Sequence, residues 1–238
     1  MKFFILVIIT LWKVNTLYAK LIQNDYICEM KPQEVILIGA GGHALSLAEF
    51  AGEMISGYLA NEGKAELPGI WYGPDSAAPA LVESGNFFHM AYVYSGLPVM
   101  KKRRHLIEEY EKLGARFATL VSPTAIVTPL SRLGEGCAVM NGAIINRATL
   151  GRNVIVNSGA IVEHDCVIGE NSFIGPGAVV GGFTSIGENC FIGLGARIGN
   201  GLTIGDNITV AMGAVVNKNL TEPGIYHGAG LKRFKLKE

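Results

Sequence analysis

The chain has 238 residues, of which 49% are hydrophobic, and its 20 basic and 20 acidic side chains give a formal net charge of zero. A neutral chain argues against a nucleic-acid-binding protein, which usually has a basic footprint. The length and apolar content predict one large domain or two smaller ones.

Residues 1–29 have the composition of a secretory signal. Lys2 precedes an apolar run and a polar stretch that ends at Ala19. The run is too short to span a bilayer as a helix, and the candidate cleavage site is poor. Because Met30 stands just before the first clear strand, we interpret 1–29 as a misassigned start, with an export signal as the alternative. This interpretation predicts a cytoplasmic protein without stable membrane insertion.

Residues 30–118 are predicted to form a small Rossmann-like α/β domain. Val35–Ile38 is a continuous apolar run, typical of a buried parallel strand. The next six residues, GAGGHA, match the pattern G-x-G-x-x-A at the start of a helix, where backbone N–H groups and the helix dipole favour a phosphate. The glycines of this motif, Gly39, Gly41 and Gly42, would let a phosphate approach the backbone. The domain is about half as long as a dinucleotide-binding fold, which favours a mononucleotide or nucleotide-sugar site.

We place the second strand at 69–72, which makes Asp75 the candidate acidic residue after it. A third strand is expected at 90–94, followed by a helix that Gly114 ends near Leu113. This helix contains the basic run 101–104. We interpret the run as a solvated helix face, with contacts to nucleotide phosphates as the alternative.

A six-residue period runs from Ile126 to Thr221 and divides this segment into sixteen blocks with no insertion and no deletion. Fourteen blocks begin with Ile, Leu or Val, and Arg132 and Ala138 are the exceptions. Such a repeat fits neither an ordinary strand nor a helix, but it fits a short strand plus a corner, with three blocks in each triangular coil. We therefore predict that residues 119–238 form a β-helix. Its first and its small fifth positions should point inward.

The four cysteines have no CxxC spacing, and two of them, Cys166 and Cys190, occupy the inward fifth position. We therefore expect core residues of a reducing compartment, without a disulfide framework or a metal.

His164 is the one histidine within the sixteen blocks, at an outward or corner position that the scaffold does not require. Its expected neighbours, eighteen residues away, are Asn146 and Gly182, and Asp165 is placed to orient its ring. An imidazole near neutral pKa can accept a proton from an attacking amine or hydroxyl. A plain surface histidine is the alternative. A zinc-dependent carbonic anhydrase on this scaffold is excluded, because such a site needs three histidine ligands.

The GAGGHA start, the short domain after it and the stretch NSGAIVEHDC at 157–166 together resemble one bacterial family. It is the hexapeptide-repeat sugar acyltransferases, which include sialic acid O-acetyltransferases and N-acetyltransferases of UDP-linked 4-amino sugars. The resemblance implies a left-handed β-helix, a homotrimer and acetyl-CoA as co-substrate. It also implies that His164 is the general base, that Asp165 assists it and that Asn157 places the acceptor. The loop that holds the nucleotide-sugar in this family corresponds to Gly39, Gly41, Gly42 and His43. The residues expected to line the acetyl-CoA groove are Phe173, Gly182 and Gly195.

The sequence departs from this family at Phe173, where many members have a second histidine, and in the loop 95–98. Glycines at 228 and 230 replace a usual motif near the carboxyl terminus. The resulting hypothesis is direct acetyl transfer to the 4-amino group of a UDP-linked sugar in surface-glycan biosynthesis. The alternatives are O-acetylation of a sialic-acid-like sugar and a non-catalytic nucleotide-sugar-binding protein.

Overall fold

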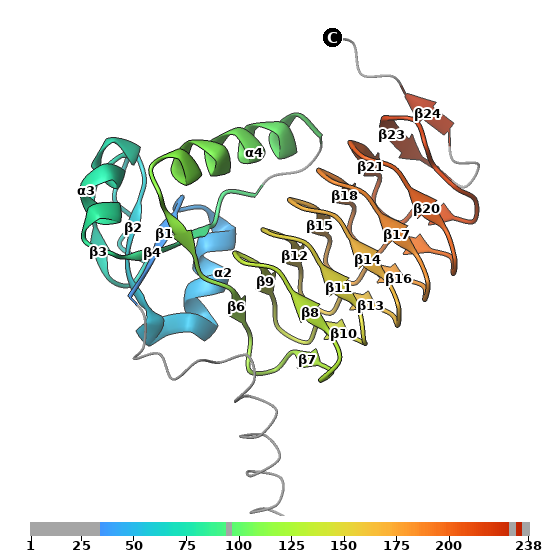
Figure 1. Ribbon diagram of the computed structural model, residues 1–238, viewed down its shortest axis with the longest axis horizontal. Coiled ribbons are helices and arrows are strands. Elements are labelled where there is room, and N and C mark those ends of the chain that lie inside the picture. Colours follow the sequence, from blue (N-terminus) through green and yellow to red (C-terminus); the bar gives the residue numbers. More distant parts are fainter. Residues whose placement is uncertain (1–33, 94–96, 229–231, 235–238) are drawn as a thin grey trace, which may run out of the picture. The chain divides into compact units, whose positions relative to one another are not determined.

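A small parallel α/β part is followed by a long coil of short strands that stack on one another (Figure 1). The computed structural model describes residues 34–93, 97–228 and 232–234. The expected leader at 1–29 and residues 95 and 96 of the loop at 95–98 lie outside the described residues.

The α/β part contains a five-stranded parallel sheet in the order β3-β2-β1-β4-β5. Its strands are β1 (Val35–Ile38), β2 (Ile55–Leu59), β3 (Ile70–Trp71), β4 (Phe87–Met90) and β5 (Arg116–Phe117). Its helices are α2 (Gly42–Ala51), α3 (Ala78–Glu83) and α4 (Leu97–Lys112), with short 3-10 turns η1 (Gly52–Met54) and η2 (Asp75–Ala77). The strand order reverses beside β1, so the carboxyl ends of β1 and β4 form the crevice where open α/β sheets bind ligands.

The first expected strand and both expected helices are present, but two strands differ from the sequence prediction. The sequence does not predict β2, because Ser56 and Gly57 interrupt its apolar pattern. Gly57 is needed where it stands, since a Cβ there would lie 2.2 Å from the carbonyl oxygen of Ile70 on β3. The strand expected at 90–94 is β4, which the structure places earlier, at Phe87–Met90. The sequence analysis missed its start because His89, which is fully buried, interrupts the apolar run.

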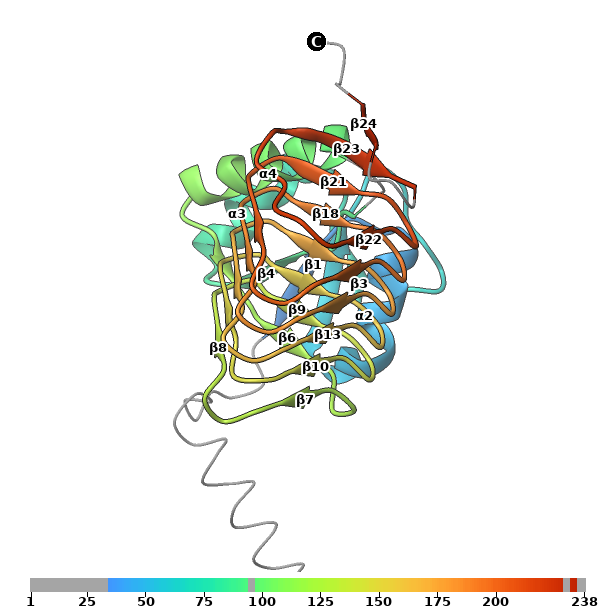
Figure 2. The same ribbon diagram turned by 90° about the vertical axis from the view of Figure 1, so that its right-hand side faces the viewer.

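The remaining strands form a left-handed parallel β-helix with three flat faces, and its coils lie one above another in Figure 2. The face that packs against the α/β part, here called the covered face, contains β6 (Leu120–Val121), β9 (Ala138–Val139), β12 (Ile155–Val156), β15 (Phe173–Ile174), β18 (Phe191–Ile192), β21 (Ile208–Val210), β23 (Gly224–His227) and the antiparallel β24 (Lys232–Phe234). A second face, here called the apolar face, contains β7 (Ile126–Val127), β10 (Ile144–Ile145), β13 (Ile161–Val162), β16 (Val179–Val180), β19 (Arg197–Ile198) and β22 (Val215–Val216). The third, here called the polar face, contains β8 (Arg132–Leu133), β11 (Thr149–Leu150), β14 (Val167–Ile168), β17 (Ser185–Ile186) and β20 (Thr203–Ile204).

The interior of the β-helix is a continuous column of aliphatic side chains. From Leu150 to Val216 the first residue of each predicted block is buried, as expected. Small side chains at the fifth position, such as Ala160 and Ala178, are buried beside them at the narrow corners. Cys166 and Cys190 are free thiols in this core, so their expected packing role is confirmed.

The repeat contains one deletion, contrary to the unbroken period that the sequence analysis assumes. Ile144 pairs with Ile161 at an offset of seventeen residues, whereas Thr149 pairs with Val167 at an offset of eighteen. The corner 146–148, between β10 and β11, is therefore one residue shorter than its neighbours.

This deletion explains the two exceptions in the aliphatic series. Before residue 146 the inward residue is the second of each block, so Leu133 and Val139 face the interior beside the outward Arg132 and Ala138. Consecutive aliphatic residues, as in β10, fit both frames, and the sequence therefore conceals the shift.

The outward side chains give each face a different character. On the covered face Ala138, Ile155 and Phe173 are buried in one cluster with Leu47 of α2 and other residues of the α/β part. The outward residues of the polar face are Arg132, Thr149, Val167, Ser185 and Thr203. Those of the apolar face are Ile126, Ile144, Ile161, Val179, Arg197 and Val215.

Helix α4 is fixed to the corner between the polar and covered faces. Arg103 is fully buried there and donates hydrogen bonds to the carbonyl oxygen of Asn153, at 3.0 Å, and to the side chain of Asn171. Arg104 forms ion pairs with Glu108 and Glu170. The prediction of a solvated run at 101–104 is therefore wrong for Arg103, because this side of the helix faces the β-helix and not water.

Candidate active site

Helix α2 begins at the crevice between β1 and β4. Gly39 has a φ of 106°, a conformation that favours glycine, and it directs the chain into the helix. Gly41 precedes the first turn, and no side chain of the described residues caps that turn. A Cβ added to Gly41 or Gly42 would meet no described atom within 4 Å. The backbone N–H groups are therefore accessible and, with the helix dipole, attract an anion.

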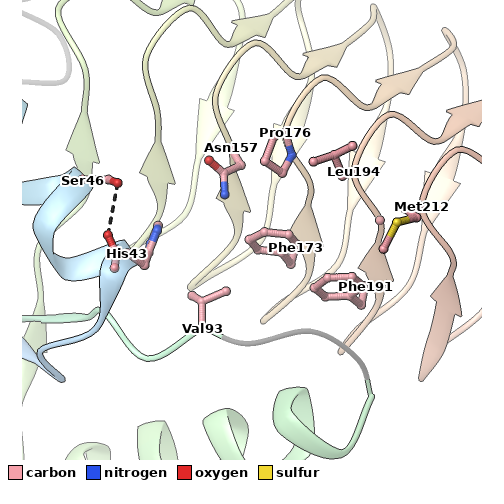
Figure 3. Close-up of a pocket in the computed structure, with 11 residues that line it drawn as sticks. His43, Ser46, Val93, Asn157, Phe173, Pro176, Phe191, Leu194 and Met212 are labelled. Carbon is pink, nitrogen blue, oxygen red and sulfur yellow. Dashed lines mark hydrogen bonds between the residues drawn. The ribbon is translucent and has the colours of Figure 1, made fainter.

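A cavity of about 400 Å³ lies between this helix start and the β-helix (Figure 3). Gly42, His43 and Ser46 line it on the α2 side. On the β-helix side it is lined by Asn157, Phe173, Pro176, Phe191, Gly193, Leu194 and Met212. The rings of Phe173 and Phe191 are stacked, with centroids 4.8 Å apart and an interplanar angle of 7°. The cavity thus joins an anion-attracting helix end to a flat apolar wall.

Four expected site residues, Gly42, His43, Asn157 and Phe173, line this cavity. Gly39 and Gly41 form the adjoining turn, and Gly195 follows a lining residue without lining the cavity itself.

The sequence analysis missed Phe191, Leu194 and Met212. Phe191 pairs in register with Phe173, and Leu194 and Met212 follow Pro176 at the same eighteen-residue spacing. Projection of one coil onto the next from Phe173 would have revealed Phe191, and projection from Pro176 would have revealed the other two.

His43 belongs both to the cavity wall and to a buried polar cluster. Burial, with smaller contributions from His89 and Arg103, lowers the pKa of His43 to about 3. Burial likewise lowers the pKa of His89 to about 4, while Nδ1 of His89 lies 2.9 Å from the carbonyl oxygen of Ala118. Both imidazoles are therefore neutral near pH 7, and positive potential at this site comes from the backbone of α2 rather than from His43.

Asp75 lies apart from these residues. It belongs to η2, after β3, and accepts a hydrogen bond of 2.8 Å from the hydroxyl of Tyr110 on α4. Burial and Asp75 together raise the pKa of Tyr110. The acidic residue that follows β2 is the exposed Glu62, at the position that contacts ribose in dinucleotide-binding folds. The sequence analysis missed Glu62 because it missed β2.

His164 and Asp165 form a hydrogen-bonded pair at the corner between β13 and β14. Nδ1 of His164 lies 2.9 Å from Oδ2 of Asp165. Arg147, and then His164, hold the pKa of the Asp165 carboxyl below its usual range. An ionised carboxylate accepts the proton of Nδ1, which leaves Nε2 of His164 with a free lone pair. His164 is partly exposed, with 42% of its side chain accessible, so Nε2 can meet a substrate.

Gly182 stands in the coil above His164, as the eighteen-residue spacing predicts. A Cβ at Gly182 would lie 2.8 Å from Nε2 of His164, so the imidazole itself occupies the space that a side chain at this position would need. The ring of Phe183 meets the imidazole edge-on, with centroids 5.0 Å apart.

The coil below differs from the prediction, which gave Asn146 as the neighbour of His164. Because that corner is one residue shorter, Asn146 instead donates a hydrogen bond of 3.1 Å to Glu163. Arg147 lies opposite Asp165, and the N–H of Asp165 donates to the carbonyl oxygen of Arg147 at 3.0 Å. His164 therefore has no counterpart in the coil below.

The two groups of candidate residues are separate within one chain. Asn157 precedes β13 and His164 follows it, so they lie at opposite edges of the apolar face. Consequently His164, Asp165 and Gly182 are not among the residues that line the cavity.

Within the described ranges, no cluster of three or more histidine, cysteine, aspartate or glutamate side chains is arranged to hold a metal ion. None of the helices described has the length and apolar character needed to cross a membrane.

Two family models match the β-helix. Residues 147–182 match the bacterial transferase hexapeptide (six repeats), and residues 183–218 match the hexapeptide repeat of succinyl-transferase. Among curated proteins, none matches the sequence significantly.

Solved structures give broader matches. The chain is 32% identical to PerB from Caulobacter crescentus, a structure in complex with CoA and GDP-perosamine, with a TM-score of 0.76 over 87% of this chain and 100% of the other. It is 30% identical to the acetyltransferase domain of PglB from Neisseria gonorrhoeae FA1090 in complex with acetyl coenzyme A, with a TM-score of 0.76 over 85% and 99%. WeeI from Acinetobacter baumannii AYE shares the fold at 21% identity, with a TM-score of 0.68 over 85% and 100%.

Proposed function

The chain belongs to the hexapeptide-repeat sugar acyltransferases and is an acetyl-CoA-dependent acyltransferase, and we propose that its acceptor is the 4-amino group of a nucleotide-linked sugar. The match to a perosamine N-acetyltransferase that binds GDP-perosamine and CoA supports an amino acceptor. The ligand in that structure is GDP-linked, whereas the sequence analysis predicts a UDP-linked acceptor. UDP-linked and GDP-linked sugars must therefore be compared directly as acceptors.

The cavity beside α2 supports this class of acceptor. The uncapped N–H groups at Gly41 and Gly42 would hold the diphosphate, and the exposed Glu62 stands where a ribose hydroxyl would be bound. The stacked rings of Phe173 and Phe191 would support the sugar, while the Asn157 side chain would bind its polar groups.

The chemical step assigned to His164 is proton removal from the acceptor amine. As the amine nitrogen attacks the thioester carbonyl carbon, Nε2 of His164 takes its proton, and Asp165 stabilises the resulting imidazolium. The tetrahedral intermediate then collapses: the new C–N bond remains, the C–S bond breaks, and the CoA thiolate takes the proton from His164. Both substrates must be held in line for this transfer, which supplies a large part of the rate enhancement.

The observation that carries this assignment is the His164–Asp165 pair. It leaves Nε2 of the partly exposed imidazole without a hydrogen-bond partner among the described residues, at a corner where a β-helix needs neither residue.

A homotrimer would complete the site. On the apolar face, all outward side chains of the strands are aliphatic apart from Arg197. A second copy packed against this face would cover the aliphatic surface and place His164 of one chain near the cavity of its neighbour. The acetyl-CoA groove, with Gly182 and Gly195, would then lie between adjacent β-helices.

The test is an acceptor screen with acetyl-CoA. UDP-linked and GDP-linked amino and hydroxy sugars are mixed with the protein, CoA release is followed with a thiol reagent, and products are identified by mass spectrometry. His164→Ala should lower kcat by about 100-fold to 10,000-fold, the usual contribution of a general base. His105→Ala, which removes an exposed histidine of α4, is the matched control and should be neutral.

Full activity of His164→Ala would disprove the general-base assignment. Acetylation of a hydroxyl instead of an amine would favour the O-acetyltransferase alternative. Calorimetry that detects nucleotide-sugar binding but no acetyl-CoA binding would favour a non-catalytic protein.

A further inference from the structure

The one-residue deletion at 146–148 places Arg147 directly beside the candidate catalytic pair. Arg147 and Asp165 both have positive φ values, 47° and 60°, and they occupy equivalent corner positions in successive coils. Their side chains therefore leave the corner side by side.

Arg147 donates two hydrogen bonds to the Asp165 carboxylate. Nε donates to Oδ1 at 3.1 Å, and Nη2 donates to Oδ2 at 2.5 Å. A two-point contact between guanidinium and carboxylate fixes the plane of the carboxylate, which a single contact does not. The oxygen that Nη2 contacts is the same Oδ2 that faces Nδ1 of His164.

His164 depends on this carboxylate for its orientation. Its Nδ1 has no other hydrogen-bond partner among the described residues, and the coil below supplies no residue under the ring. Phe183 touches the ring edge-on but cannot distinguish the two ring nitrogens by hydrogen bonding. The tautomer and tilt of the imidazole are thus set by Asp165.

We propose that Arg147 is a positioning residue that holds the Asp165 carboxylate against Nδ1 of His164 and thereby presents Nε2 as the free base. The inference rests on the proposed role of His164. The charges that face the imidazole are Asp165 and Glu163 on its own corner and Arg147 on the corner below. Gly182 and Phe183, on the corner above, bring no charge.

Removal of the Arg147 charge should strengthen the hold of His164 on its proton, because the negative carboxylate then acts unopposed. For Arg147→Met we expect the acidic limb of the kcat/KM–pH profile to move to higher pH by about half a unit, the order expected for loss of one nearby charge at a half-exposed site. We also expect a plateau about tenfold lower, because the carboxylate is no longer held in place.

Arg147→Lys separates charge from geometry. Lysine keeps the positive charge but cannot make the two-point contact, so the midpoint of the profile should stay while the plateau falls. In an Asp165→Asn background, Arg147→Met should cause little further change, since the two residues act through one contact. Arg132→Met removes an exposed arginine from the polar face without touching Asp165 and is the matched control.

A titration of His164 by NMR, on protein without substrates, makes the test independent of catalysis. A higher His164 pKa in Arg147→Met supports the inference, even if His164→Ala proves active and the base assignment fails. An unchanged titration and an unchanged ring tautomer in Arg147→Met overturn it, even if His164→Ala is inactive. Circular dichroism of each variant verifies that the fold is retained.

Discussion

At the scale of single residues, the β-helix carries side chains that its folding does not require, and His164 is the clearest example. His164 lies beside a carboxylate that is itself fixed by a guanidinium, and a glycine stands over the nitrogen that remains free. This combination keeps the imidazole oriented while it stays accessible, which is what a base for an incoming amine requires.

Gly182 provides a direct test of that accessibility. An added Cβ would lie 2.8 Å from Nε2 of His164, well inside van der Waals contact. We expect Gly182→Ala to turn the imidazole away and to lower kcat by about tenfold or more. The thermal midpoint should stay within about 4 °C of the wild type, because the nearest atoms that the added methyl group would meet belong to the partly exposed His164 ring. Steady-state kinetics together with a thermal melt would show this. Undiminished kcat would mean that the space above His164 is not used.

At the scale of elements, the short corner between β10 and β11 stands out from an otherwise regular coil. The strand pairings that span this corner, such as Ile144 with Ile161, have an offset of seventeen residues. From β11 to β22 the parallel pairings on each face keep an offset of eighteen, as between Ile161 and Val179. The shortened corner brings Arg147 opposite Asp165 and leaves the space under His164 without a backbone neighbour.

An insertion separates the role of this corner in folding from its role in the site. One alanine inserted after Ile145 would restore an eighteen-residue coil and move Asn146 beneath His164. We expect the thermal midpoint to change by less than about 4 °C, because regular corners elsewhere have this length, while activity falls about tenfold. Circular dichroism melts and the CoA-release assay would measure the two effects. A collapse of stability with normal specific activity would show that the deletion serves the fold instead.

The start of α2 is a second element with a defined role. Because burial keeps His43 neutral, the anion-binding capacity of this region belongs to backbone groups that any sequence with the same glycines would present. In the proposed complex, side chains of the cavity wall such as the stacked Phe173 and Phe191 would then select the sugar.

At the scale of the whole molecule, each face of the β-helix has a different role. The covered face packs against the α/β part, the polar face carries mostly polar outward residues, and the apolar face carries mostly aliphatic ones. Large apolar patches on a protein surface are often interaction sites, which is why we propose that the apolar face is the trimer interface.

We expect Val179→Glu to convert a trimer into monomers and to lower activity at least tenfold, because it places a charge in the centre of the proposed interface. Sedimentation velocity and the CoA-release assay would detect both effects. Ser185→Glu, an outward residue at the same level on the polar face, is the matched control and should leave both properties unchanged. A monomeric wild-type protein with full activity would contradict the shared site.

Several features followed from the sequence because they depend on local chemistry. The six-residue period predicted the β-helix, since inward and corner positions demand aliphatic and small residues one after another. The apolar run before GAGGHA predicted β1 and the start of α2, and His164 was conspicuous because no other block carries an imidazole.

Other features were decided by tertiary structure, because they depend on how one coil lies on the next. The frame of the repeat was ambiguous where two aliphatic residues adjoin, so the deletion at 146–148 and the Arg147–Asp165 contact emerged only from strand pairing. The strand β2 was concealed by Gly57, whose lack of a side chain is explained by the proximity of β3. The burial of Arg103 reflects the packing of α4 on the β-helix, since a basic run on a helix carries no mark of what will cover it.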